Sequence, residues 1–459
     1  MPVSPVLKTA PQHEIFILYP RWLADVSHCQ TLEDHALFIE RGRIRDLLPA
    51  PLARQKYADL PAIELPKHLL IPGLVNLHAH AAMSLLRGFA DDLPLKVWLE
   101  ERIWPAEGKL VSRDFIYDGT LLACAEMLQS GITTFNDMYF FPDDAARAAL
   151  DIGMRLAAGV CAFDFPTPSG PNWAEDLKNG EAAMAAAGRH SRLSWCVAPH
   201  APYSVGDEGL AACRDFSQKH GIPVHIHVQE TAGEVTEHLA RYGCRPTERL
   251  WRLGLVDARL IAVHAVHTNA EDIETLARGG ASMAHCPASN LKLASGIAPL
   301  NQWLEAGLNV GLGTDGAASN NRLDLLSEMR LAALLAKGVS GRADAAPAWA
   351  ILRMATLGGA KALGLDHETG SLDVGKAADM VALDLSVMKL QPVYDPVSHL
   401  LYCAEREQVE AVWVEGRCCV FGKSLTPRVH SCLGKLDGRL ALWQNAAGSS
   451  LRTDRDGSF

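Results

Sequence analysis

The sequence of 459 residues lacks two features that would indicate particular classes of protein. Its 11 cysteines are scattered singly, apart from the neighbours Cys418 and Cys419, and no C-x-x-C pair occurs. Nothing therefore indicates a thiolate zinc site or a redox motif, and we expect buried, reduced thiols. No run of about 18 apolar residues is present, so we expect no membrane span.

A run of basic residues is also absent. The 43 Lys and Arg residues are outnumbered by 53 Asp and Glu residues, which gives a formal net charge of −10. Binding to a phosphate backbone needs many cationic contacts, so nucleic acid polymers are not expected as partners. Residues 1–20 lack the basic and then apolar pattern of a secretory signal, and we expect a cytoplasmic protein.

Hydrophobic residues make up 48% of the chain, which is enough for a large core. Apolar and β-branched runs indicate strands near both ends, at 14–18, 36–40, 44–48, 63–65, 380–383 and 409–414. The simplest arrangement is one small β domain built from residues 1–72 and 369–459. We expect its C-terminal part to end in a helix over about 436–444 and a disordered tail.

Between these segments, in residues 73–368, short apolar strands alternate with longer amphipathic stretches. This alternation predicts an α/β fold, specifically a (β/α)8 TIM-type barrel inserted into the small β domain. The eight predicted strands are 73–78, 133–137, 155–160, 192–197, 223–227, 260–264, 281–285 and 309–314. Helical spacing is clearest at 115–129, 208–220, 271–277 and 323–336.

The C-terminal ends of the predicted strands carry many histidines and acids, and active sites of such barrels lie at these ends. His78 and His80 end the first strand, on one face because they are two residues apart. His227 ends the fifth strand, and Asp315 follows the eighth. Three histidines and a carboxylate suit Zn²⁺ and leave a position open for water, so we predict one zinc ion on these four residues.

Further titratable residues lie at the same strand ends. His200, Glu230 and His264 follow or end the fourth, fifth and sixth strands. His225 lies on the same face as His227 but one layer deeper, so we expect it to fill the barrel interior. His267 falls in a loop, and for His285 a structural role and a hydrogen bond near the site both stay open.

Several motifs resemble those of the amidohydrolase superfamily, especially its branch of 5′-methylthioadenosine/S-adenosylhomocysteine deaminases, chlorotriazine hydrolases and guanine deaminases. The matching segments are PGLVNLHAHAAMSLLRG at 72–88, VHIHVQET at 224–231, HCPASNLKL at 285–293, GTDGAASNN at 313–321 and TGSLDVGKAAD at 369–379. The similarity covers nearly the whole chain. It implies hydrolytic deamination of an adenine nucleoside, and a homo-oligomer that is a dimer or a tetramer.

The resemblance also implies residues that bind the substrate. Glu107, in WLE and IWPAE at 98–107, matches a glutamate that contacts the ribose hydroxyls, and His200, in APHAPYS, matches a histidine that contacts the nucleoside. Arg155 is a candidate for the arginine that binds substrate in relatives. Members with two metals generally bridge them with a carboxylated lysine at the end of strand four, and no lysine lies between Arg192 and Ser204, so one metal is expected. Iron replaces zinc in some relatives.

These roles combine into one mechanism. A bound metal would lower the pKa of water towards about 7. Asp315 would take the water proton, Glu230 would protonate the ring nitrogen beside the attacked carbon, and His264 would orient the attacking oxygen. The same site could instead deaminate guanine or hydrolyse a triazine, which lack the ribose that Glu107 would hold. A non-catalytic assembly protein is a further alternative, but such members typically have incomplete metal ligands.

Overall fold

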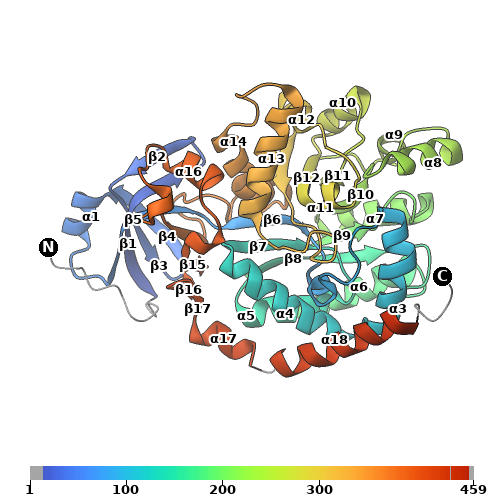
Figure 1. Cartoon of the computed structure of the whole chain (residues 1–459), viewed down its shortest axis with the longest axis horizontal. Coiled ribbons are helices and arrows are strands. Elements are labelled where there is room, and N and C mark those ends of the chain that lie inside the picture. Colours follow the sequence, from blue (N-terminus) through green and yellow to red (C-terminus); the bar gives the residue numbers. More distant parts are fainter. Residues whose placement is uncertain (1–13, 435, 454–459) are drawn as a thin grey trace.

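Two sheets form the β structure of this computed structural model, which describes residues 14–434 and 436–453. One of them is a barrel of eight parallel strands in which each strand pairs with the next one along the chain (Figure 1). Its strands are β6 (Leu74–Ala79), β7 (Ile132–Asp137), β8 (Arg155–Ala162), β9 (Leu193–Pro199), β10 (Val224–Val228), β11 (Leu260–His264), β12 (Ser282–His285) and β13 (Asn309–Leu312). All eight predicted strands are confirmed, and their ends shift by at most two residues.

Polar contacts complete the barrel where β13 returns beside β6. Asn76 donates from Nδ2 to Oγ1 of Thr314 at 2.7 Å, and its Oδ1 accepts from the Thr314 backbone N–H at 2.9 Å. The next N–H, of Asp315, donates to the His78 carbonyl at 3.0 Å. The junction that nearly closes the barrel therefore places Asp315 beside His78.

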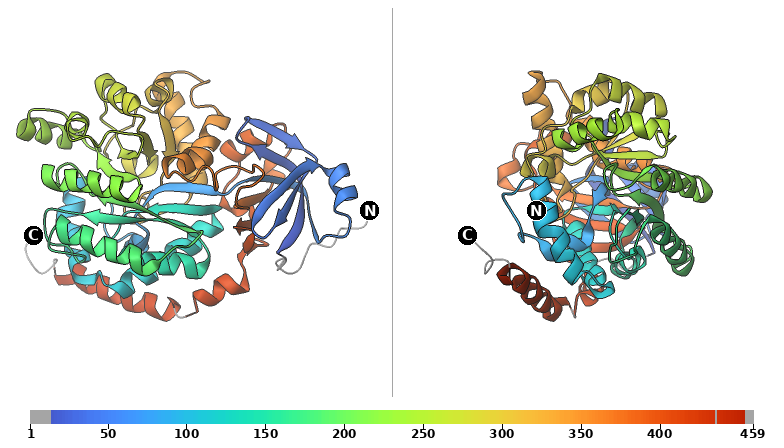
Figure 2. Two further views of the ribbon diagram at one scale, coloured as in Figure 1. Left: turned by 180° about the vertical axis from the view of Figure 1, so that it is seen from behind. Right: turned by 90° about the vertical axis from the view of Figure 1, so that its right-hand side faces the viewer.

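Helices connect the barrel strands and cover them from outside (Figure 2). The four clearest predictions correspond to α4 (Arg113–Gln129), α7 (Asp207–His220), α10 (Ala270–Gly279) and α13 (Leu325–Ser340). Caps fix two of their starts, because Asn269 forms a capping box with Asp272 and Asp324 accepts from N–H groups in the first turn of α13. The others in this region are η1 (Ala81–Leu86), α2 (Leu95–Val97), η2 (Trp98–Ile103), α3 (Trp104–Leu110), α5 (Pro142–Ile152), α6 (Trp173–Ala187), α8 (Ala232–Tyr242), α9 (Pro246–Arg252), α11 (Pro287–Lys292), α12 (Leu300–Glu305), α14 (Ala348–Arg353), η3 (Met354–Gly358) and α15 (Gly359–Ala362).

The second sheet takes strands from both ends of the chain, which confirms the composite β domain. Its path is β17-β16-β15-β14-β5-β1-β3-β4, with β2 paired to β1. The strands are β1 (Ile15–Asp25), β2 (Gln30–Glu33), β3 (His35–Glu40), β4 (Arg43–Pro49), β5 (Ala62–Pro72), β14 (Met380–Asp384), β15 (Val409–Val414), β16 (Arg417–Phe421) and β17 (Ser424–Leu425). Short helices α1 (Ala50–Lys56), η4 (Met388–Leu390), α16 (Pro396–Tyr402), η5 (Arg406–Gln408) and α17 (Pro427–Cys432) accompany them. The boundaries at 72/73 and 368/369 stay a prediction.

Some strands of this sheet were not predicted. β5 is longer than 63–65 because it continues through Pro66, Lys67 and His68, which interrupt the apolar pattern, and then pairs with β14. β2, β16 and β17 were missed because they are short and owe their strand conformation to a neighbouring strand rather than to their own residues.

The C-terminal helix α18 (Leu436–Thr453) leaves the sheet and lies along α3 and α4 (Figure 1). Nε1 of Trp443 donates to Oδ2 of Asp118 at 2.8 Å, and Arg439 pairs with the same carboxylate at 2.7 Å. The helix predicted over 436–444 is therefore present and longer than expected. The tail predicted beyond it lies, from residue 454, outside the described residues. Among the helices that are described, none is long and apolar enough to span a bilayer.

Arg155 corrects a prediction, because it does not lie at the candidate site. It is the first residue of β8 and so sits at the opposite end of the barrel from the strand C-termini. Its side chain is buried, with Nε 3.1 Å from Oδ2 of Asp379. The same carboxylate accepts from the Thr369 hydroxyl at 2.8 Å and the Glu415 N–H at 2.6 Å. Arg155 therefore joins the barrel to the terminal sheet and lies away from the candidate site.

Replacing Arg155 with methionine is expected to destabilise the fold without weakening substrate binding. The change leaves the Asp379 carboxylate buried without its ion-pair partner, which costs about 3–5 kcal/mol of unfolding free energy. Denaturant unfolding of Arg155→Met would be compared with that of Arg147→Met, which removes an exposed arginine on α5 whose partner Asp144 keeps its ion pair with Arg113. A higher KM with unchanged stability would return Arg155 to the substrate site.

Candidate active site

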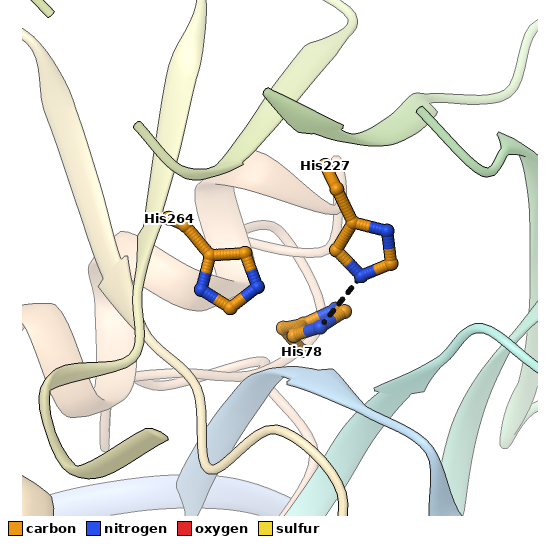
Figure 3. Close-up of side chains that lie close together, drawn as sticks. All are labelled: His78, His227 and His264. Carbon is orange, nitrogen blue, oxygen red and sulfur yellow. Dashed lines mark hydrogen bonds between the residues drawn. The ribbon is translucent and has the colours of Figure 1, made fainter. Parts of the chain in front are cut away.

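The four predicted metal ligands meet at the C-terminal end of the barrel. His78 and His80 come from the end of β6, His227 from β10, and Asp315 from the segment after β13. The Nε2 atoms of His78 and His227 are 3.2 Å apart. Oδ1 of Asp315 lies 3.4 Å from Nε2 of His78 and 3.3 Å from Nε2 of His80. Figure 3 shows His78 and His227 directed at one another, with His264 of β11 beside them.

The protein fixes the opposite ring nitrogens of these histidines. Nδ1 of His80 lies 2.6 Å from the Met138 carbonyl, and Nδ1 of His227 lies 2.8 Å from the His200 carbonyl. Since a carbonyl only accepts, each Nδ1 carries a proton, and Nε2 is the ring atom that can offer a lone pair to an ion at the common centre. Three imidazole nitrogens and one carboxylate oxygen around one point fit a divalent ion such as zinc.

The remaining strand-end histidines support the site or the core. His225 is buried one layer deeper, as predicted, with Nε2 3.0 Å from Nδ1 of His78, so it also helps to orient that ring. Nε2 of His267 lies 2.7 Å from the Ser295 carbonyl. His285 is buried against Trp303, with ring centroids 5.8 Å apart, which favours the structural alternative for this residue.

Two acids and a histidine surround the same centre. Nε2 of His264 is 3.8 Å from Oε2 of Glu230 and 3.9 Å from Oδ2 of Asp315. Burial raises the pKa of Glu230 above its usual value, against the opposing effect of His264. Burial acts in the same direction on Asp315, but hydrogen bonds with His78 and His80 outweigh it and hold the pKa of Asp315 well below its usual range. Glu230 is thus suited to donate a proton and Asp315 to accept one.

A single segment, residues 289–295, holds all three of these groups, although no role was predicted for its residues. The contacts are Ser289 Oγ to Asp315 Oδ2 at 2.6 Å, His264 Nδ1 to Asn290 Oδ1 at 2.8 Å and Ser295 Oγ to Glu230 Oε1 at 3.1 Å. The segment follows β12, so the rule that chemistry lies after the strand ends could have pointed to its polar residues.

The backbone is strained at two of the reactive positions. His264 has a φ of 64° and Asp315 a φ of 62°, in the left-handed region that residues with side chains seldom adopt. Such strain persists only where surrounding contacts fix it, and it is common at active sites. Here the contacts from residues 289–295 hold both side chains.

A pocket opens beside this cluster. It has a volume of about 960 Å³ including its mouth, and its walls include Trp98, Trp104, Phe163 and Phe165. His200 also lines it, with its ring stacked on Phe163 at 5.0 Å, and burial lowers the pKa of His200 to about 3, so this ring is neutral.

Glu107 of α3 lines the same pocket and is only 5% exposed. Its Oε1 accepts from the Tyr139 hydroxyl at 2.5 Å. Burial raises the pKa of Glu107 to about 7, although the bond from Tyr139 opposes the shift. Of the nine predicted site residues, the structure places seven on the pocket wall, His78 directly behind His227, and Arg155 elsewhere. Tyr139 and the aromatic walls were not predicted, because their contacts are tertiary and the sequence does not reveal them.

Comparison with known proteins gives consistent results for sequence and structure. Residues 69–419 match the amidohydrolase family. The chain is 44% identical over 401 residues to the 5-methylthioadenosine/S-adenosylhomocysteine deaminase of Teredinibacter turnerae, covering 87% of this chain and 91% of that protein.

Comparison with solved structures finds the same fold in related enzymes. A zinc-bound adenosine deaminase from Xanthomonas campestris superimposes with a TM-score of 0.92 at 41% identity, covering 95% of this chain and 98% of that one. The zinc complex of atrazine chlorohydrolase from Arthrobacter aurescens has a TM-score of 0.85 at 23% identity, covering 93% and 100%, and shows a shared fold alone.

Proposed function

The chain belongs to the amidohydrolase family, and from this premise we propose that it deaminates an adenine nucleoside by hydrolysis. Water replaces the 6-amino group, and the products are the inosine analogue and ammonia. The substrate is 5′-methylthioadenosine, S-adenosylhomocysteine or adenosine. The observation that carries this proposal is that Glu107 shares one pocket with Glu230, His264 and the metal-type donor cluster.

One zinc ion per chain is the proposed cofactor, held by His78, His80, His227 and Asp315. The donors suit it because the Nε2 atoms of His78 and His227 lie 3.2 Å apart, and Oδ1 of Asp315 lies 3.3 to 3.4 Å from Nε2 of His80 and His78. When bound, the metal supplies a water molecule of lowered pKa. No lysine between Arg192 and Ser204 is present to bridge a second ion.

The protein's own groups then move the protons. Asp315 accepts a proton as the water oxygen bonds to C6, and Glu230 protonates the neighbouring ring nitrogen N1. His264, whose Nε2 lies within 4 Å of both carboxyl groups, hydrogen-bonds to the attacking oxygen. Glu230, now a carboxylate, takes the remaining proton from the oxygen on C6 and passes it to the amino group, the C6–N bond breaks and ammonia leaves, and Asp315 returns its proton to Glu230. The two water protons end on N1 and on ammonia, so both carboxyl groups are regenerated.

Glu107 favours a nucleoside over a free base. The site that deaminates adenine could also accommodate guanine or a triazine, but neither ring carries the two ribose hydroxyls that a buried acceptor carboxylate would bind. A hydrogen bond to a charged group contributes about 1.5–3 kcal/mol, which corresponds to a preference of roughly 10- to 100-fold.

Ammonia release tests this proposal directly. Metal-loaded protein would be assayed with 5′-methylthioadenosine, S-adenosylhomocysteine, adenosine, adenine and guanine at matched concentration. We expect a nucleoside to exceed both free bases in kcat/KM by at least about tenfold. Guanine as the best substrate would favour the alternative activity, and no release from any of the five would overturn the proposal.

Nucleoside binding is expected to weaken in acid. Burial raises the pKa of Glu107 to about 7, so the carboxylate form that accepts ribose hydroxyls predominates only above that pH. The ionised fraction falls about tenfold from pH 8 to pH 6, and KM for adenosine should rise by about the same factor. The KM profile of adenine should lack this change. If the change persists in Glu107→Gln, another group is responsible.

A further inference from the structure

Tyr139 contacts the proposed ribose-binding carboxylate from within the pocket wall. We propose that Tyr139 is a positioning residue that sets selectivity for a sugar with free 2′- and 3′-hydroxyls, acting through Glu107. This inference rests on the proposed function and adds a residue that determines specificity at the same site.

The contact between the two side chains is short and buried. The Tyr139 hydroxyl donates to Oε1 of Glu107 at 2.5 Å, and each residue is 5% exposed. Within the described part of the chain, no other side-chain donor and no cation bonds to the Glu107 carboxylate. Tyr139 therefore fixes the rotation of the carboxylate and leaves Oε2 free to accept from a ligand.

Tyr139 is itself fixed by the segment that supports the metal-type cluster. The preceding residue, Met138, accepts from Nδ1 of His80 at 2.6 Å, and Asp137 accepts from the Ala81 N–H at 2.7 Å. Sγ of Cys161 donates to the Tyr139 carbonyl at 3.3 Å. One stretch at the end of β7 thus orients both a proposed metal ligand and the carboxylate that would receive the sugar.

In this arrangement the bound sugar sets the position of the base. When the diol of a nucleoside binds Glu107, residues 137–139 determine the distance between the purine ring and the metal-type cluster. Without the Tyr139 hydroxyl, the carboxylate can rotate, so the advantage of a substrate that carries the diol should shrink. Substrates without the diol gain nothing from the pair and should be insensitive to its loss.

The test compares adenosine with 2′,3′-dideoxyadenosine, which carries the same base without the two hydroxyls. In Tyr139→Phe we expect kcat/KM for adenosine to fall about 10-fold, mainly through KM, because a hydrogen bond to a charged group is lost. For dideoxyadenosine we expect a change below about twofold. In a Glu107→Ala background, the same Tyr139→Phe change should cost nothing further, since its effect passes through Glu107.

Tyr117→Phe is the matched control. It also removes a hydroxyl that donates to a carboxylate, Asp151 at 2.8 Å, but it lies on α4 and does not line the pocket. We expect wild-type kinetics on both substrates and unchanged metal content in every variant. Equal losses on both substrates in Tyr139→Phe, or losses that add to those of Glu107→Ala, would overturn the inference. Wild-type protein that is metal-loaded yet releases no ammonia from adenosine or methylthioadenosine would overturn the proposed function itself.

Discussion

Replacing Glu230 with glutamine is expected to lower kcat by roughly 10²–10⁴-fold, the range typical of acid–base residues, while metal stays bound. The amide keeps the shape of the side chain and can accept from Ser295, which lies 3.1 Å from Oε1 of Glu230. It cannot transfer a proton to the ring, and Glu230 is not among the proposed ligands. Steady-state kinetics and metal content, measured on the same samples, separate the two properties.

Glu237→Gln is the control for this change. Glu237 lies on α8 a short distance along the chain, with its side chain 69% exposed, and we expect nearly wild-type kinetics. Unchanged turnover in Glu230→Gln would remove Glu230 from the acid–base role. Loss of the metal in that variant would place Glu230 among the ligands instead.

Removing the metal is expected to abolish deamination, and one equivalent of zinc per chain is expected to restore it. The chemistry needs water of lowered pKa, which a divalent ion supplies. Mutation of a residue that only hydrogen-bonds a metal ligand lowers metal affinity by roughly 10- to 100-fold. His227 is a proposed ligand itself, so we expect His227→Asn to lower metal affinity by more than this. Titration of chelator-treated protein with zinc, followed by activity and by thermal unfolding, measures stoichiometry and stabilisation together.

His430→Asn provides the matched histidine change, because His430 is exposed on α17 and far along the chain from the ligands. Full activity in metal-free protein would contradict the mechanism. Two tightly bound equivalents in active protein would contradict the single-metal prediction. Equal activity with iron would leave the four proposed ligands unchanged and revise only the identity of the bound ion.

The barrel and the end that carries the candidate site were predictable because most of its strands are fully buried, β9 and β13 being partly exposed at their starts. The sequences of β10 and β11 are continuously apolar except where a histidine ends or interrupts them. The apolar run therefore predicts the strand, and the histidine marks the end at which the candidate site lies. Once the strands were located, the histidine and acidic residues followed from the single rule that they lie at the C-terminal ends.

Contacts made by residues beyond the strand ends were not predictable in the same way. Ser289, Ser295 and Tyr139 belong to residue types that are common in any connecting segment, and only tertiary contacts reveal that they hold carboxyl groups of the candidate site. The prediction that Arg155 binds substrate was wrong for a different reason. The residue's place at the start of a predicted strand argued for the non-catalytic end, and the weak resemblance to relatives was followed instead.

The composite sheet also has a consequence for biosynthesis. β5 ends at residue 72, but its partner β14 begins about 300 residues later. At a translation rate of about 5–20 residues per second, the ribosome needs roughly 15–60 s to deliver that partner. Throughout this interval the nascent chain exposes one unpaired edge of β5, a surface that invites aggregation unless a chaperone covers it.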